Sequence, residues 1–435
     1  MISNANINVP WYHTCKEVSP EASSLLNDVT ADVAIIGGGI MGLSTALSLA
    51  ENGVNVIVLE AFDVGDGASG RNGGLVVPLM RAHPDEIRKN LGSRGDMLVK
   101  TVINSADVVF DLIEKYKIDC DSVRKGFLQP VHASCLMSSV ENSAKAWSQS
   151  GSPCEFVGAD ETARMLGTNS YHGALFDPSG GYLNPIAYTR GLARAGLSQG
   201  VKVYSNSPVT AAKRLGDGKW KLSAAMGSVK ADTVIQCVGA QIPGLDFQPG
   251  KSAAKSLIPI VLHGLATKPL TKAQQTTILP TKVAATDTRN YVLSVGYDSE
   301  HRIVTSGAAP FGDNKIGLSQ MERFVAKRLQ RVYPKIGEIE FKFIWKGTAA
   351  LNIDWLPKIF EPAEDWFSLT SCNGRGIALS TSIGQVFGTS LVKNNFDGMP
   401  LPRVCPKPIA LRKVAGGVMA RLLIPAGSIQ DRWRE

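Results

Sequence analysis

Three glycines and one acid at a fixed spacing are the residues of this sequence with the clearest chemical use. Gly37, Gly39 and Gly42 directly follow an apolar run, and Glu60 ends the next one. In a G-x-G-x-x-G turn the glycines allow a tight turn, the approach of backbone N–H groups to a pyrophosphate, and close packing of a helix. A carboxylate about twenty residues later can accept the hydroxyls of an adenosine ribose. This pattern predicts a dinucleotide site.

A second glycine-rich stretch follows the acid. GASGRNGGL, residues 67–75, contains four glycines, a serine, an arginine and an asparagine within nine residues. A loop of this kind has no purpose in most enzymes that bind NAD. It suits a longer cofactor that continues past its pyrophosphate into a buried ring. The stretch therefore favours FAD over NAD.

The hydropathy pattern places these loops on a βαβ unit. Residues 32–60 form a strand, a glycine turn, a helix and a second strand, and residues 33–36 have the pattern of a strand buried on both faces. Residues 185–200 have helical spacing, and residues 233–238 form another buried strand that ends at Gly239. The carboxyl end of such a strand is where ligands bind in open α/β sheets.

The remaining segments predict a second unit. Residues 80–155 begin with polar helical sequence, and residues 250–342 alternate as strands, with a hairpin at 291–309. The fold class expected is α/β: a Rossmann-like FAD-binding domain with a central parallel sheet, and an α+β substrate domain with an antiparallel sheet. The expected boundaries are an N-terminal extension at 1–29, a discontinuous FAD-binding domain at 30–80, 156–248 and 343–400, a substrate-binding domain at 81–155 and 249–342, and a C-terminal segment at 401–435.

Composition narrows the class of protein. The chain has 435 residues, 44% of them hydrophobic and 19% charged, which is typical of a globular protein. The net charge is +8, but Lys and Arg are scattered, so no nucleic-acid partner is expected. Seven cysteines without a C-x-x-C pair signal no metal site. Without a secretion signal or an 18-residue apolar run, a cytoplasmic monomer or homodimer with no membrane partner is expected.

One feature of the tail leaves an alternative open. The segment Val414 to Ile429 is apolar and helical in pattern. We expect it to pack on its own domain, and the alternative is a helix that docks on a membrane or a partner.

Together the motifs resemble the D-amino acid oxidase (DAO) superfamily of FAD enzymes, in the branch of glycine and sarcosine oxidases and most closely the γ-glutamylputrescine oxidases. The resemblance covers about residues 30–395 and rests on GGGIMG with Glu60, GASGRNGG, GGYLNPIAYTRGLARAGLSQGVKVY, ADTVIQCVGA, WKGTAALNIDWLP and SCNGRGIALSTSIG. Motifs and resemblance together predict these cofactor-binding residues: Gly37, Gly39, Ile40, Met41, Gly42, Glu60, Ala61, Ala68, Ser69, Arg71, Asn72, Gly73, Gly74, Leu75, Val209, Val238, Gly239, Gly374, Arg375, Gly376 and Ile377.

The resemblance also bears on how the cofactor is attached. Sarcosine oxidase has a cysteine bonded to the flavin where this chain has Gly347, and some relatives have a bonding histidine where this chain has Asn72 and glycine. Non-covalent FAD is therefore expected.

The chemistry implied by the resemblance is oxidation of a C–N bond of an amine, an N-alkylated compound or an amino acid to an imine, by hydride transfer to flavin N5. Relatives hold the substrate carboxylate with an arginine where this chain has Ala349. Another anchor is then needed, and the candidates are Arg375, Lys346, Arg289 and Tyr291. His263 is the histidine most suited to act as a base. The expected catalytic residues are Arg375, His263, Lys346 and Tyr291.

The electron acceptor and the substrate class leave alternatives. The lysine that activates O2 in sarcosine oxidase corresponds to Thr305 here, yet other branches are oxidases without it. An oxidase that reduces O2 to H2O2 is favoured over a dehydrogenase that uses a carrier or a quinone. A 2-hydroxy acid dehydrogenase, with His263 or His301 as base, is the alternative within enzymes. A non-catalytic flavoprotein or an RNA-modifying factor is the alternative suggested by the basic composition.

Overall fold

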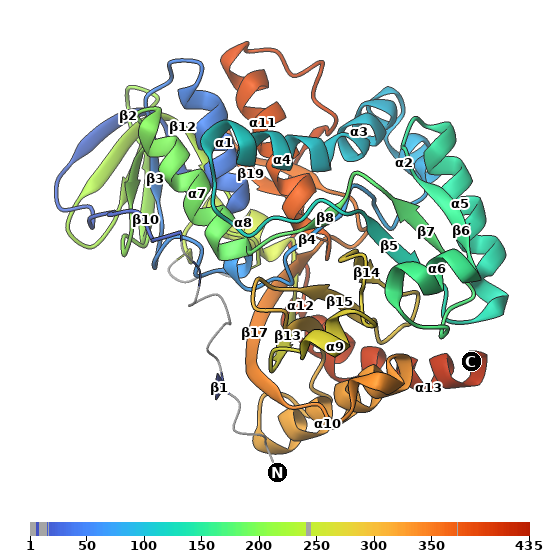
Figure 1. Ribbon diagram of the computed structural model, residues 1–435. Helices are drawn as coiled ribbons and strands as arrows, with labels where there is room; N and C mark the ends of the chain where they lie inside the picture. The colour runs from blue at the N-terminus through green and yellow to red at the C-terminus, as the bar shows by residue number, and fades with distance from the viewer. Residues whose placement is uncertain (1–5, 8–14, 16, 241–244, 372) are drawn as a thin grey trace.

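Two large sheets lie side by side in the computed structural model, which describes residues 6–7, 15, 17–240, 245–371 and 373–435. One sheet is largely parallel and lies at the upper left of Figure 1, and the other is largely antiparallel and lies below it and to its right. This topology confirms the predicted fold class.

The parallel sheet contains the predicted βαβ unit. Its four central pairs, β19–β12, β12–β2, β2–β3 and β3–β9, are all parallel. Residues 33–36 and the whole of β3 are buried, as the apolar runs predict. In spatial order its strands are β20 (Arg403–Val404), β18 (Lys358–Ala363), β19 (Trp366–Thr370), β12 (Ser228–Gln236), β2 (Val29–Ile36), β3 (Val56–Leu59) and β9 (Lys202–Tyr204), with β10 (Ala211–Arg214) and β11 (Trp220–Ser223) extending from β12.

Three helices pack beside one another on this sheet. α1 (Ile40–Ala50) lies between α7 (Pro185–Ser198) and α11 (Gly376–Val392). A Cβ at Gly388 of α11 would lie 2.7 Å from the side chain of Ser48, so glycine allows α1 and α11 to approach closely. A Cβ at Gly384 would lie 3.0 Å from the carbonyl oxygen of Met41, so the start of α1 packs against the middle of α11.

The antiparallel sheet carries α10 against β16, α12 against β13, and α5 and α6 against β7. The predicted hairpin is present as β15 and β16. In spatial order the strands are β1 (Asn6–Ile7), β17 (Phe341–Leu351), β13 (Ile258–Thr267), β16 (Ile303–Gly307), β15 (Ser294–Tyr297), β14 (Ala284–Thr286), β5 (Phe127–Pro130), β7 (Gly173–Asp177) and β6 (Glu155–Gly158).

Shorter elements complete the described residues. A two-stranded sheet joins β4 (Leu75–Val76) to β8 (Gly181–Tyr182). The other helices are α2 (Pro84–Leu91), α3 (Ser93–Ile103), α4 (Ser105–Tyr116), α5 (Met137–Gln149), α6 (Ala159–Leu166), α8 (Gly250–Lys255), α9 (Lys272–Gln275), α10 (Lys315–Val332), α12 (Arg412–Val418) and α13 (Ile424–Arg434), with 3-10 turns η2 (Ala68–Gly70), η3 (Ser134–Leu136) and η4 (Pro334–Ile336) and a π-turn η5 (Met419–Leu423).

The domain boundaries stay a prediction. β6, β7 and β17 pair within the antiparallel sheet, whereas the expected boundaries placed residues 156–248 and 343–400 in the FAD-binding domain. An alternating pattern shows that a segment is a strand but not which sheet it joins. From the pairing we propose that residues 155–177 and 341–351 belong to the substrate-binding domain.

Candidate active site

The first glycine loop is shaped for close approach of a ligand. It follows the carboxyl end of β2 and leads into α1, whose N-cap is Gly39. Gly37 has φ +111°, and a Cβ there would lie 2.8 Å from the carbonyl oxygen of Cys237. A Cβ at Gly42 would lie 2.1 Å from the carbonyl oxygen of Gly37. The turn therefore requires glycine at these positions, and it brings the N-terminus of a helix to the edge of the sheet.

Glu60 lies beside this loop at the end of β3. Its Oε2 accepts a hydrogen bond of 2.6 Å from the backbone N–H of Gly38, and its Oε1 accepts one of 3.0 Å from Phe62. Burial raises the pKa of the Glu60 carboxyl, and these two N–H groups oppose the rise. The carboxylate is held in place by backbone, with lone pairs remaining for ribose hydroxyls.

A cavity opens between these loops and the carboxyl ends of the strands. Many predicted cofactor residues line it: Gly37, Gly39, Met41, Glu60, Ala61, Ala68, Ser69, Val209, Val238 and Gly239. The glycine cradle and the fixed carboxylate fit the adenosine and pyrophosphate part of FAD. Thr348 and Ala350 of β17 also line the cavity, and the sequence reasoning did not find them, although they alternate with Gly347 and Ala349.

The second glycine loop is folded against both the first loop and β17. The Ser69 hydroxyl accepts a hydrogen bond of 2.9 Å from the N–H of Ile40, the first residue of α1. The Asn72 amide donates to the carbonyl of Ser69 at 2.7 Å and accepts from the N–H of Gly74 at 2.8 Å. The indole of Trp345 donates to the carbonyl of Arg71 at 3.1 Å. The loop is therefore a rigid bridge between the two sheets.

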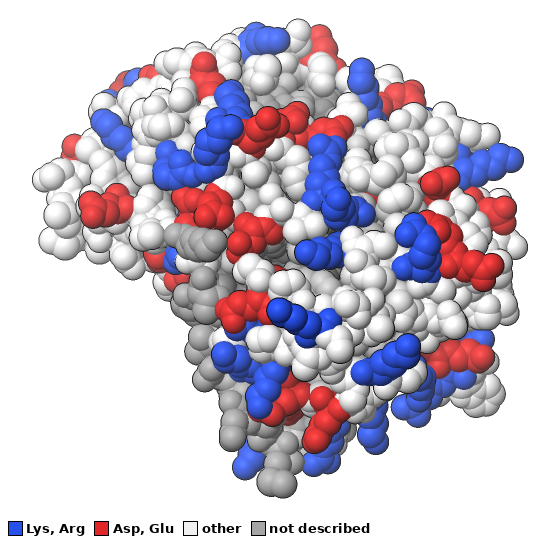
Figure 2. Space-filling view, in the orientation of Figure 1, with Lys and Arg blue, Asp and Glu red and all other residues white. Residues whose placement is uncertain are grey.

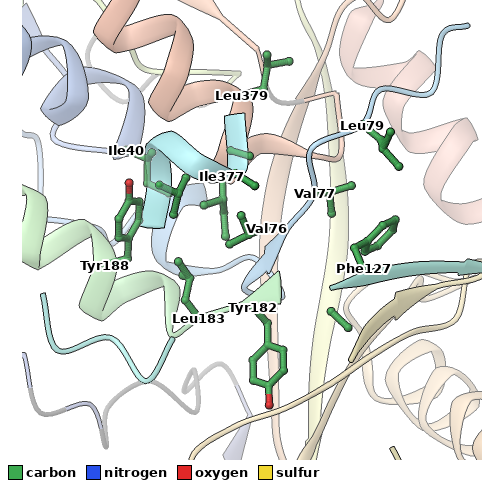
Figure 3. Packing of buried hydrophobic residues seen from close by; sticks show 14 of the residues in the cluster. Ile40, Val76, Val77, Leu79, Phe127, Tyr182, Leu183, Tyr188, Ile377 and Leu379 are labelled. Carbon is green, nitrogen blue, oxygen red and sulfur yellow. The ribbon is translucent and has the colours of Figure 1, made fainter. Parts of the chain in front are cut away.

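The chain after this loop leads to the third motif. Leu75 pairs with Tyr182, and a Cβ at Gly74 would lie 2.1 Å from the carbonyl oxygen of Leu183. Figure 3 shows Val76 beside Ile377 of α11, with Val77, Leu79 and Phe127 further along the same chain segment and β5. Gly376 and Ile377 are the first two residues of α11, and Gly374 precedes them with φ +86°.

Arg375 is the N-cap residue of α11 and faces the antiparallel sheet. Its Nη1 donates to the carbonyl of Leu79 at 3.4 Å, and its guanidinium carbon lies 5.7 Å from the centre of the Phe127 ring of β5. It is half-buried between the two sheets. Burial, followed by the positive charge of Arg81, lowers the pKa of Arg375 to about 9, so it is charged at neutral pH.

Arg81 is a residue that the sequence reasoning missed. It follows the second glycine loop without any motif of its own, and its guanidinium carbon lies 5.5 Å from the centre of the Trp355 ring. Burial among protein atoms lowers the pKa of Arg81, although its side chain keeps contact with solvent. Among the described residues, no acidic side chain forms an ion pair with Arg81 or Arg375. Arg81 therefore lies near enough to Arg375 for its charge to lower the pKa of Arg375, and neither arginine has an acidic partner within the described residues.

His263 and Lys346 are brought together by strand register. They lie opposite each other on β13 and β17, and both reach Asp313: His263 Nε2 is 3.1 Å from Oδ1 and Lys346 Nζ is 3.1 Å from Oδ2. Burial lowers the pKa of His263, which favours the neutral ring, although Asp313 opposes the shift. Neither residue is among those that line the cavity.

Tyr291 and Arg289 lie away from the cavity lining and face the C-terminal segment. The Tyr291 hydroxyl donates to the carbonyl of Ala308 at 3.0 Å, and its backbone N–H donates to Asp431 at 3.1 Å. Arg289 is buried and pairs with Asp287 and with Glu435. Both side chains therefore form hydrogen bonds or ion pairs with other residues of the protein. A role of either residue in substrate binding stays a prediction.

The positions compared with relatives also have defined surroundings. A Cβ at Gly347 would lie 3.2 Å from the carbonyl oxygen of Arg71, so a larger residue needs that loop to shift. Ala349 lies opposite Ile260. Thr305 is buried on β16, and its hydroxyl has no hydrogen-bond partner within the described part of the chain. His301 lies in the turn before β16 with φ +59°.

Comparison with known proteins gives a consistent result. The model of the family described as DAO, FAD dependent oxidoreductase, matches residues 32–388. Gamma-glutamylputrescine oxidoreductase of Escherichia coli is 28% identical over 85% of this chain and 85% of its own length. A probable oxidoreductase OrdL of Haemophilus influenzae is 27% identical over 86% of this chain and 87% of its own. The crystal structure of glycine oxidase from Geobacillus kaustophilus aligns with a TM-score of 0.69 at 20% identity, over 84% of this chain and 95% of that one.

Proposed function

The chain belongs to the family of FAD dependent oxidoreductases, with FAD as its cofactor, and from this premise we propose that it oxidises a C–N bond of an amine or amino acid that carries a carboxylate, giving an imine. The observation that carries the proposal is Arg375, a half-buried guanidinium at the N-terminus of α11 that lies near Arg81 and, like Arg81, has no acidic partner among the described residues. Two cations held together are stabilised by an anion between them, and a carboxylate suits the planar fork of a guanidinium.

Different residues around Arg375 would bind the cofactor and the substrate. FAD, when bound, supplies the acceptor for a hydride from a carbon that bears nitrogen. Glu60 and Ser69, with the two glycine loops, hold the cofactor, and the N-terminus of α11 adds a positive dipole to the site. Arg375 orients the substrate through its carboxylate, and the apolar surface of Val77, Leu79 and Phe127 excludes water.

Substrate nitrogen must be neutral before a hydride can leave the adjacent carbon. The cationic pair favours this state, because two positive charges nearby lower the pKa of a substrate ammonium group. His263 and Lys346 remain proposed catalytic residues, with Asp313 fixing both side chains.

Related enzymes support further parts of the proposal. The relative in Escherichia coli is named gamma-glutamylputrescine oxidoreductase, and the structural neighbours include glycine oxidase. We propose that O2 is the electron acceptor. The cysteines that the structure describes are free, which suits a cytoplasmic location.

The proposal is tested by incubating the FAD-loaded protein in air with amines, amino acids and 2-hydroxy acids, and by measuring peroxide and carbonyl products. We expect both products from amines that carry a carboxylate. Carbonyl product without peroxide, with reduction of an added dye, would contradict O2 as acceptor and leave the substrate class intact. Turnover of 2-hydroxy acids alone would contradict the proposed C–N oxidation.

We also propose that FAD is held without a covalent bond, because Gly347 has no side chain and Asn72 is occupied by hydrogen bonds within its own loop. Acid precipitation of the yellow protein is then expected to release the colour into the supernatant, as measured by absorbance. A pellet that stays yellow after washing in acid and denaturant would show a covalent bond and contradict this expectation.

A further inference from the structure

The C-terminal segment has one face fixed to the protein. It runs through α12, the π-turn and α13, and its buried positions are Arg412, Gly416, Ala420, Ser428 and Asp431. These positions recur at intervals of three, four or eight residues, so they share one side of the helix.

Specific contacts lock this face in place. Arg412 Nη1 donates to the carbonyls of Ala254 and Leu257, each at 3.0 Å. The buried Asp431 carboxylate accepts from the backbone N–H of Asn290 at 2.8 Å. A Cβ at Gly416 would lie 1.8 Å from the carbonyl oxygen of Pro259. The buried face therefore packs on the rest of the protein, as expected. Because this face is fixed, the opposite face of the segment must point outward.

The opposite face carries a row of exposed apolar side chains, which we call the C-terminal stripe: Leu411, Val414, Val418, Leu422, Ile429 and Trp433. Their spacing of three, four or seven residues places them along one side of the helix. Leu422 is 59% exposed and Trp433 is 87% exposed. The stripe extends from Leu411, just before α12, through the π-helical turn to Trp433 in α13. An apolar row of this length is more than scattered surface hydrophobicity, and it marks a surface for interaction.

The charges of the C-terminal segment that have no ion-pair partner are all positive in the described part of the chain. Within the described residues 405–435, the exposed cations are Lys407, Lys413, Arg421, Arg432 and Arg434. No ion pair joins these cations to an acidic side chain in the described part of the chain. The two acids of α13 and the chain end do not neutralise these cations. Asp431 is buried, and Glu435 forms ion pairs with Arg289 and Arg331. In Figure 2, Lys and Arg side chains gather along the lower right edge, where Figure 1 places α10 and α13.

We propose that the C-terminal stripe binds the surface of a membrane that contains anionic lipid, with the helix lying in the interface. An amphipathic helix with Leu, Val and Trp on one face and Lys and Arg beside them has the chemistry of an interfacial anchor. The surplus of cations complements anionic headgroups. No described helix is long and apolar enough to span a bilayer, which agrees with an anchor that stays in the interface. This proposal is independent of the proposed function.

The same charges argue against other occupants. A second copy docked through the stripe would bring two sets of unpaired cations together, which is repulsive. A lipid surface needs neither a matching groove nor a register.

The test is co-sedimentation of the full FAD-loaded chain with vesicles of phosphatidylcholine alone or with phosphatidylglycerol added. We expect binding to the anionic vesicles that weakens as salt is raised. L422S combined with W433S is expected to lower vesicle affinity at least tenfold, because two exposed apolar side chains that would enter the membrane interface are lost. R432Q combined with R434Q is expected to lower it about fivefold per cation on anionic vesicles alone.

M226S is the matched control. Met226 is 70% exposed and lies in the turn between β11 and β12, outside the stripe. M226S should leave vesicle binding unchanged, and all variants should keep their flavin content and thermal stability. Absence of binding to anionic vesicles would overturn the proposal, as would equal binding by the L422S/W433S variant. A dimer that this variant converts to monomer, without vesicle binding, would assign the stripe to a second copy instead.

Discussion

Replacing Gly39 with alanine is expected to weaken FAD binding by one to two orders of magnitude. A Cβ at this position would lie 2.6 Å from the hydroxyl oxygen of Ser69, which accepts the hydrogen bond from Ile40. The methyl group must displace Ser69 and would also obstruct the start of α1, where we propose that the pyrophosphate would bind. Loss of one hydrogen bond to a charged group costs about 1.5 to 3 kcal/mol, which corresponds to one to two orders of magnitude in affinity. Titration of the apoprotein with FAD, followed by flavin fluorescence, measures the change.

Gly158→Ala provides the matched control for this substitution. Gly158 is also the N-cap of a helix, α6, with extended backbone at φ −70°, and a Cβ there would meet nothing within 4 Å. Both variants should unfold at a temperature close to that of the parent when FAD is absent. Equal FAD affinity in the parent and in the Gly39 variant would show that the first loop does not hold the pyrophosphate.

Replacing Arg375 with alanine is expected to lower kcat/KM for carboxylate-bearing substrates by roughly 30- to 150-fold, or about 2 to 3 kcal/mol. The physical reason is the loss of a charge-assisted contact in a partly buried place, where Arg81 is a nearby cation that remains. Arg81→Ala is expected to act in the same direction and less strongly, because Arg81 is open to solvent. Steady-state kinetics on each variant measure these effects.

Two comparisons separate substrate binding from a structural role of Arg375. Arg375→Lys keeps the charge and should recover part of the activity, although it loses the planar fork. An amine without a carboxylate should react with the parent and with Arg375→Ala at similar rates. If the alanine variant loses activity equally toward both kinds of amine, Arg375 supports the fold of the loop and does not hold the substrate.

Local patterns predicted many of the residues that line the cavity, and their binding of FAD stays a prediction. The glycine spacing, Glu60 and the buried strands lie within one stretch of about thirty residues, where sequence neighbours are also neighbours in space. The family, the fold class and FAD were predicted from these motifs and are confirmed. Local geometry is dictated by local sequence here, because a tight turn between strand and helix leaves few alternatives to glycine.

Contacts between segments that are far apart in the chain could not be predicted from the sequence. Arg81 and Arg375 meet only because the chain after the second glycine loop passes the start of α11, and neither position carries a periodic pattern. Thr348 and Ala350 reach the cavity because β17 ends between the two sheets. Tyr291 and Arg289 were predicted near the substrate from residue type alone, and the structure places them against the C-terminal helix.

Oxidation of a C–N bond is tested most directly by mixing the FAD-loaded protein, without oxygen, with three matched compounds: an amino acid, an amine of the same carbon skeleton without the carboxylate, and the corresponding 2-hydroxy acid. Loss of the yellow absorbance follows the transfer of electrons and needs no assumption about the acceptor. We expect the amino acid to bleach the flavin quickly, the amine to bleach it more slowly, and the hydroxy acid not to bleach it. Bleaching by the hydroxy acid alone would contradict oxidation of a C–N bond.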